Sequence, residues 1–204
     1  MNVRNSTSAR LAIAVAFSFL CGNRAFAQHV SAGVVAGGAL TSDFTPLDIA
    51  TTSYVEHSIS KDYIVGGMLA VSIPWDFSLE ADAMYRPMTF AGTIVLPSGA
   101  FTDRPSDVLT WEVPILLQYK FKPNALPLRP LLEIGPSFRA SGNRNGTAPS
   151  SDGVTAGAGL EADVWKLKVA PQFRYTRWAA DGAHPPLSPN TKPDQIELLV
   201  TVAF

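Results

Sequence analysis

Apolar and polar residues alternate with a period of two along most of this chain, and helical periodicity is almost absent. In residues 76–88, for example, Phe77 and Tyr85 occupy one row, whereas Glu80 and Arg86 occupy the other. Successive side chains of a β-strand point to opposite faces, so this pattern is typical of a strand with one apolar face. Eight segments of strand length show it, and an all-β fold is therefore expected. They are residues 29–40, 62–73, 76–88, 108–121, 128–140, 153–165, 166–178 and 195–204.

The connections between these segments alternate in length. Short turns fall at residues 74–75, 122–127 and 165–166, whereas residues 141–153 and 179–194 are long polar loops. An even number of strands lets an up-and-down sheet close on itself. Short turns at one end and long loops at the other are typical of outer-membrane barrels. The predicted fold is therefore an eight-stranded antiparallel up-and-down transmembrane β-barrel.

The distribution of charge predicts which row faces lipid. The apolar row carries no charge in the strand centres. A Lys or Arg on the lipid face at mid-bilayer costs about 2–4 kcal/mol, so this absence favours an apolar row that faces lipid. The polar row then faces the lumen. We expect its charged residues to form an ion-pair network there: Glu80, Asp82, Arg86, Glu112, Glu133, Arg139, Glu161, Arg174 and Glu197.

A soluble secreted barrel of the lipocalin type is the alternative arrangement, with the apolar row inside and the polar row in water. Its water-facing surface would then include Gly66, Gly157, Leu116 and Leu131, which make a poor soluble surface. Aromatic residues near the short turns instead fit the interfacial girdle of a membrane barrel. These residues are Trp75, Tyr119, Phe121 and Trp165.

Charges inside a narrow barrel need partners, and the hairpin geometry suggests ion pairs between neighbouring strands. The suggested pairs are Asp163 with Lys168, Glu112 with Arg139, Arg86 with Glu112, and Arg174 with Glu197. An eight-stranded barrel has little room beyond its own side chains. We therefore expect a lumen plugged by ion pairs; a small-solute channel with a gated polar lumen is the alternative.

Three prolines lie inside the predicted strands, at positions 114, 136 and 171. Proline has no backbone N–H and cannot donate to a ladder. We expect local bulges or interruptions of the ladder at these sites.

The amino-terminal segment has the organisation of a secretory signal peptide. Arg4 and Arg10 precede an apolar segment, residues 11–21, that is too short to span a bilayer as a helix. Ala25 and Ala27 fit the small-x-small rule for cleavage. We predict export through the general secretory route.

Two regions are thus expected: a signal peptide over residues 1–27 and a barrel domain over residues 28–204. Cleavage removes three of the 16 Lys and Arg residues and none of the 17 Asp and Glu residues, which leaves a mature net charge of about −4. The single cysteine, Cys21, is removed as well, so no disulfide framework and no cysteine metal cluster are expected. Nothing in this charge balance indicates nucleic-acid binding.

Catalytic chemistry is sparse in this sequence. The three histidines are His29, His57 and His184, and Ser188 follows the last of them in a segment interrupted by prolines. A histidine and a serine near the membrane boundary are the arrangement of lipid-modifying barrel enzymes, which keeps such an enzyme as an alternative. We expect no catalytic residues, no metal site and no cofactor, since no phosphate-binding or calcium-binding loop pattern is present either.

Four segments, WEVPILLQYKF, PLLEIGPSFR, GAGLEADVWKLKVAPQFRYTRW and QIELLVTVAF, resemble the outer membrane protein β-barrel domain family of small PorT-like and OmpA/OmpX-like bacterial barrels. The resemblance covers nearly all of residues 28–204. It implies a monomeric barrel in the outer membrane of a Gram-negative-type bacterium, in contact with outer-membrane lipid. It also implies a structural or surface-interaction role, without naming an extracellular ligand.

The final segment resembles the signal read by the outer-membrane assembly machinery. Its alternating apolar row ends in an aromatic residue, through Val200, Val202 and Phe204. The assembly machinery is therefore an expected partner of the chain.

Overall fold

The structure is a computed structural model. It describes residues 29–49, 54–59, 63–96, 99–102, 105–122, 128–183, 185 and 188–204. The predicted signal peptide and His184 lie outside these residues, so both remain predictions of the sequence.

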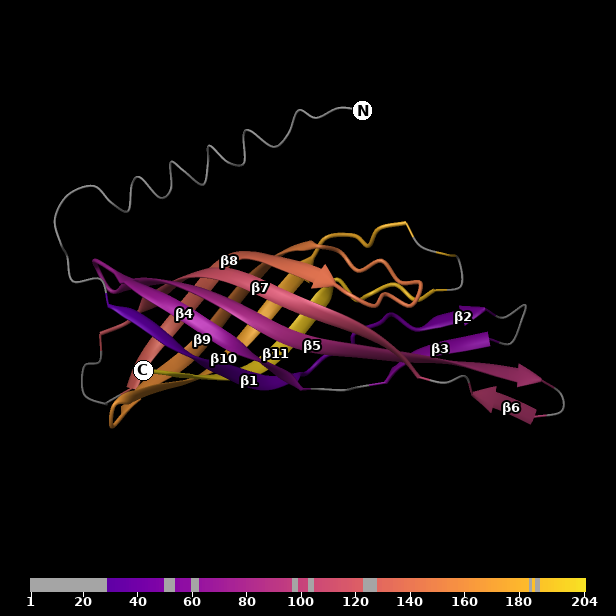
Figure 1. The fold of residues 1–204 in the computed structure, drawn as a ribbon, viewed down its shortest axis with the longest axis horizontal. Helices are drawn as coiled ribbons and strands as arrows, with labels where there is room; N and C mark the ends of the chain where they lie inside the picture. The colour runs from indigo at the N-terminus through magenta and orange to yellow at the C-terminus, as the bar shows by residue number, and fades with distance from the viewer. Residues whose placement is uncertain are drawn as a thin grey trace, which may run out of the picture.

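Eight long strands form a closed antiparallel barrel, which confirms the predicted fold class (Figure 1). The strands follow one another around the barrel in the order β5-β4-β1-β11-β10-β9-β8-β7, and pairing between β5 and β7 closes it. Their bounds are β1 Val30–Ala39, β4 Ile64–Ile73, β5 Phe77–Leu96, β7 Ser106–Lys120, β8 Leu128–Ser141, β9 Asp152–Val164, β10 Leu167–Trp178 and β11 Asp194–Ala203.

The first and last barrel strands pair with each other, from Gly33 opposite Ala203 to Ala39 opposite Glu197. The backbone N–H of Phe204 also donates to the carbonyl of Ala32, at 3.0 Å. The end of the chain is thus part of the closed wall. Because closure pairs every barrel strand on both sides, the barrel itself presents no sheet edge.

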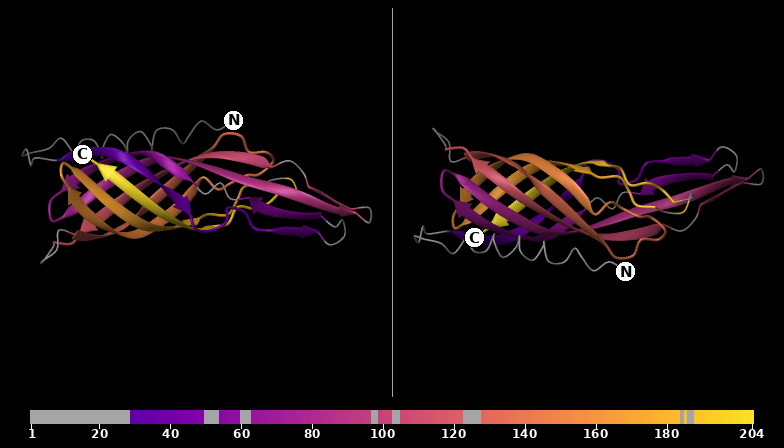
Figure 2. Two further views of the ribbon diagram at one scale, coloured as in Figure 1. Left: turned by 90° about the horizontal axis from the view of Figure 1, so that it is seen from below. Right: turned by 90° about the horizontal axis from the view of Figure 1, so that it is seen from above.

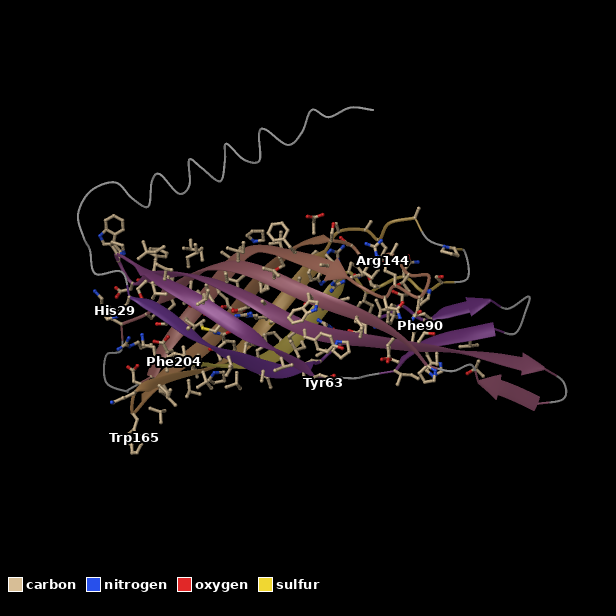
Figure 3. The ribbon with its side chains drawn as sticks, in the orientation of Figure 1. His29, Tyr63, Phe90, Arg144, Trp165 and Phe204 are labelled. Carbon is tan, nitrogen blue, oxygen red and sulfur yellow. The ribbon has the colours of Figure 1, made fainter. Side chains whose placement is uncertain are left out.

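The two ends of the barrel differ. His29, Trp165 and Phe204 lie at one end, which we call the turn end because the short connections between β4 and β5 and between β9 and β10 lie there (Figure 3). Trp75 and Trp165 adopt left-handed backbone conformations in these turns, with φ of 67° and 60°. The opposite end, the loop end, carries the long connections.

The loop end contains three strands where the sequence suggested only loops, so that expectation was wrong. They are β2 Leu47–Ile49, β3 Tyr54–Ile59 and β6 Gly99–Thr102. The fifth strand does not end near Met88 but continues to Leu96, pairing with β3 on one side and β6 on the other. Residues 89–96 remain rich in β-branched and aromatic types, and neighbouring strands complete their hydrogen bonds. Figure 2 shows this extension projecting beyond the barrel.

The prolines interrupt the ladders without inserting residues. The β7–β8 ladder lacks two residue pairs between Pro114 and Leu117, opposite Pro136, and the β9–β10 ladder lacks two pairs at Pro171. The register is the same on both sides of each gap. Of the two expected alternatives, bulges or interruptions, the interruptions are observed, because a missing N–H removes a hydrogen bond but adds no residue.

Gly135 of the lumen row lies very close to the backbone of the neighbouring strand β7. A Cβ on Gly135 would lie only 1.9 Å from the carbonyl oxygen of Ile115, within the interrupted part of the β7–β8 ladder. No side chain fits there. The narrow interior therefore depends on glycine at this position.

Candidate functional site: a filled polar lumen

All nine charged residues predicted for the lumen are buried inside the barrel, each at most 5% exposed. They come from six neighbouring strands, β5 and β7 to β11. Successive side chains of a strand point to opposite faces, so these charged residues face the lumen while the apolar residues between them face outward. They separate into two clusters and one residue, Glu161, near the turn end.

The first cluster surrounds a single guanidinium and is named the Arg174 cluster. Arg174 Nε lies 2.7 Å from Glu133, Nη2 lies 2.8 Å from Glu80, and Nη1 contacts Asp82. Gln172 and Gln118 extend it, since Gln172 Oε1 accepts from Arg174 and Gln118 Nε2 donates to Glu133. Three carboxylates thus share one cation, and these four residues come from strands β5, β8 and β10. Gln118 and Gln172 were not among the predicted residues, although both lie in the lumen row.

The second cluster contains two guanidiniums and is named the Arg86–Arg139 cluster. Arg86 Nη2 lies 2.7 Å from Asp43, and Arg86 Nη1 contacts Glu197. Arg139 Nη2 lies 2.9 Å from Glu112, and Nε donates to the same oxygen at 3.1 Å. Three carboxylates are therefore shared by two cations. Asp43 precedes the strands of the extension and lies outside the barrel wall.

A buried tryptophan completes this second cluster. The guanidinium carbon of Arg139 lies 3.8 Å from the ring centroid of Trp178, a cation–π contact. Gln195 Oε1 accepts from Trp178 Nε1 at 2.8 Å and from Arg139 Nη2 at 2.6 Å. Trp178 and Gln195 lie in the lumen rows of β10 and β11, so the same alternation that indicated Arg174 could have indicated them. Asp43 carried no such signal, because it lies in no periodic segment.

The suggested ion pairs have mixed outcomes. The Glu112–Arg139 pair is confirmed, and these residues are directly opposite each other in the β7–β8 ladder. Arg86 and Glu112 approach to only 3.8 Å. Arg174 and Glu197 face each other in the ladder as expected. Arg174 pairs with Glu133 and Glu197 pairs with Arg86, however, so the suggested pair is wrong. Long side chains in a narrow lumen reach across it rather than only to the neighbouring strand.

Asp163 and Lys168 also occupy opposite register positions. Asp163, however, pairs with Arg129 at 3.1 Å. Glu161 contacts Lys120 and lies 3.7 Å from Arg129. The charges at the turn end therefore form a third, more exposed group whose cations lie on β7 and β8.

An apolar cap covers the lumen at the loop end. It consists of Phe44, Met88, Phe90 and Val108, all buried, with the rings of Phe44 and Phe90 5.2 Å apart. Beside it, burial raises the pKa of the Asp43 carboxyl, an effect that the nearby Arg86 opposes. The segment around Phe44 thus folds into the barrel mouth and does not project from it.

The long loops predicted as plain surface are tied together. Asp181 accepts hydrogen bonds from the backbone N–H of Ser150 at 3.1 Å and from the hydroxyl of Thr191 at 2.6 Å. Phe44 in turn forms an isolated bridge with Thr191. Residues 41–46, 142–151, 179–183, 185 and 188–193 therefore cover the loop end as one connected layer.

Little free volume remains among the described residues of the lumen. Near the Arg174 cluster, a cavity of about 20 Å³ lies between Met68, Glu80, Gln118 and Leu131. A space of this size holds about one water molecule. The described lumen is filled by its own side chains.

The exterior of the barrel is apolar between two groups of aromatic side chains. Tyr63, Tyr85 and Trp111 are in contact near the loop end, with centroids 6.4 Å and 5.7 Å apart. The predicted girdle residues near the turn end are all exposed, with Trp75 and Trp165 the most so. Along β5, the eight residue steps from Phe77 to Tyr85 span about 20 Å across a membrane at ordinary strand rise and tilt. This is close to the apolar band of about 25 Å in outer-membrane barrels.

Charged side chains are again found on the exterior just beyond the aromatic groups. At the loop end, Arg177 pairs with Asp194, and the hydroxyl of Tyr175 donates to the same carboxylate. Between this pair and the turn-end aromatics, the exposed large side chains of β10 and β11 are apolar, among them Phe173, Leu198 and Val200. The apolar band is thus bounded on both sides.

Other candidate chemistry is limited in the described residues. No helix there is long and apolar enough to cross a membrane. No group of three or more His, Cys, Asp or Glu side chains in the part of the chain that the structure describes is arranged to hold a metal ion. His57 lies in β3, and Ser188 lies in the loop-end layer.

No model of a known protein family matches the chain, and no curated protein matches its sequence. Among solved structures, Neisserial surface protein A (NspA) is similar at 12% identity, over 85% of this chain and 94% of that one, with a TM-score of 0.49. The outer membrane protein OprG from Pseudomonas aeruginosa is similar at 13% identity, over 86% of this chain and 94% of its own, with a TM-score of 0.47. Such identities and scores say nothing about what this barrel does.

Proposed function

We propose that this chain is a bacterial outer-membrane barrel with a structural or surface-interaction role and a lumen that does not conduct. The observation that carries the proposal is the contrast between the two faces of one wall. Charged side chains are buried inside, whereas the exterior is apolar between two aromatic groups. Closed barrels are among the few structures whose backbone is fully satisfied in lipid.

The filled lumen supports the non-conducting part of this proposal. Arg174 of β10 lies across the interior, bound to Glu80 of β5, and Arg139 of β8 bonds both to Glu112 and to Gln195 of β11. The extension formed by β2, β3, the outer half of β5 and β6 would project from the membrane and supply the surface for interaction. We further propose that the chain has no enzymatic activity.

Reconstitution into planar bilayers tests this function. We expect heat-modifiable migration in gels, insertion into vesicles, and no stable large conductance in single-channel recordings. A reproducible porin-like pore would overturn the plugged lumen, and a mature chain that is soluble without detergent would overturn the membrane location. A lipid A mass profile that differs between cells with and without the protein would instead favour a lipid-modifying enzyme.

The assembly role of the last strand stays part of the proposal. Val200 and Phe204 are exposed on the outer face, at 39% and 76%, where a receptor for the strand could reach them. Deletion of Phe204 should reduce insertion into the outer membrane far more than substitution of the loop residue Asn145. Equal insertion of the two variants, measured by membrane fractionation, would remove this role but leave the strand in place.

A further inference from the structure

A cleft of about 390 Å³ opens at the turn end, separate from the two lumen clusters. It lies beside the β4–β5 turn and the end of β7. One part of its lining is apolar and another is basic. The residues that the argument uses are Ile73, Phe77, Phe121, Lys120, Lys122 and Arg129.

The apolar part belongs to the turn-end aromatic group. Phe77 and Phe121 flank Tyr119, with centroid distances of 5.0 Å and 4.8 Å. Both phenylalanines line the cleft, together with Ile73. Aromatic rings of this kind lie at the boundary between acyl chains and headgroups. The cleft is therefore at headgroup level if the barrel spans a bilayer.

The basic part presents three cations, and two of them, Lys122 and Arg129, have exposed acidic partners. Lys122 lies 3.2 Å from Asp76, with side chains 79% and 36% exposed, and Arg129 lies 3.1 Å from Asp163, with side chains 41% and 48% exposed. Exposed pairs of this kind contribute little to stability. A stronger anion can therefore replace the acidic partners without disturbing the wall. Lys120, the third cation, is less exposed and is bound to Glu161, which is buried in the lumen.

We propose that this cleft binds an anionic phospholipid of the leaflet at the turn end, an inference that rests on the proposed membrane location. The headgroup phosphate lies between Lys122 and Arg129, and an acyl chain lies against Phe77 and Phe121. Arg and Lys are the usual donors to phosphate, and basic pockets at the membrane surface bind lipid headgroups. The apolar part of the lining favours a lipid over a free phosphate ion, because a free ion leaves that surface uncovered.

The test uses the mature chain in nanodiscs of phosphatidylcholine with or without phosphatidylglycerol. Native mass spectrometry counts the lipids that remain bound after release. We expect the wild type to retain phosphatidylglycerol selectively, and the double variant Lys122→Ala/Arg129→Ala to retain at least about tenfold less. Lys166→Ala is the matched control, since Lys166 is an exposed cation of the neighbouring turn outside the cleft. It should retain lipid like the wild type.

Three results would overturn the assignment. The first is equal retention by the double variant and the wild type, and the second is equal retention of the two lipids. The third is binding of inorganic phosphate as tight as that of the lipid, which would assign the cleft to a free anion. Insertion is checked separately by heat-modifiable migration, so a chain that fails to insert refutes the membrane location, whereas an inserted chain without lipid selectivity refutes only the cleft.

Discussion

The two charge clusters of the lumen both pair buried carboxylates with guanidiniums, but in different ratios. The Arg174 cluster places three carboxylates around one guanidinium, and all its members belong to strands. The Arg86–Arg139 cluster places three carboxylates around two guanidiniums, and it includes Asp43 from outside the strands. The first therefore joins distant parts of the wall, whereas the second also holds the loop-end layer onto the wall.

Because the clusters contain different numbers of cations, the loss of one cation affects them differently. Loss of the cation in the Arg174 cluster leaves three buried carboxylates without a partner. Loss of one cation in the other cluster leaves a second guanidinium in place. Removing one partner of a buried pair costs about 3–5 kcal/mol, mainly because the remaining charge is left uncompensated. The two clusters should therefore respond unequally to matched substitutions.

Arg174→Leu should have the largest effect. The substitution leaves Glu80, Asp82 and Glu133 without their shared cation. We therefore expect the free energy of unfolding to fall by about 5 kcal/mol, or the heat-modifiable barrel not to form. Reversible urea unfolding in phospholipid vesicles measures the free energy. A variant within about 1 kcal/mol of the wild type would show that the cluster does not hold the wall together.

Arg86→Leu should destabilise the barrel less, by about 3 kcal/mol. Glu112 keeps its bond to Arg139, and only Asp43 and Glu197 lose their main partner. The same unfolding measurement applies, and Arg144→Leu on the exposed loop is a control of equal chemistry. A loss as large as that of Arg174→Leu would refute the proposed inequality of the clusters.

Asp43→Asn should lower the free energy of unfolding by about 1 kcal/mol, because it weakens the contact between the loop end and Arg86. The raised pKa of Asp43 means that its folded form holds a proton to higher pH than its unfolded form does. Its contribution to stability is thus fully present at low pH and is lost as pH rises through the folded pKa. Relative to the wild type, the variant should become comparatively more stable as pH rises from the ordinary value of 3.8. A difference between the two proteins that does not change with pH would contradict this assignment.

Glu80→Gln should have the smallest effect, with a free energy of unfolding within about 1 kcal/mol of that of the wild type. The amide keeps a hydrogen-bond acceptor for Arg174 and removes one of the excess negative charges. In the same cluster, Asp82 Oδ1 is buried and accepts no hydrogen bond from any described residue, as expected where acceptors are in excess. A loss above about 3 kcal/mol would mean that all three carboxylates are needed as charges.

The sequence predicted the barrel strands closely because their signal is local. Seven of the eight begin and end within two residues of the predicted bounds. The strand that begins at Phe77 was the exception, since its continuation to Leu96 depends on pairing with β3 and β6. The nine lumen residues were also found by alternation alone. Trp178 and Gln195 follow the same alternation but were not predicted, because neither side chain is charged.

By itself, the sequence determined which row of each strand is polar and how many strands can close, because a period of two is set by the backbone. Only the tertiary structure decided which charges meet. Arg174 reaches Glu80 and Asp82 over more than ninety positions of the chain, and Asp43 joins Arg86 from a segment without periodicity. Barrel closure brings distant strands within the reach of one side chain, and no local pattern records that distance.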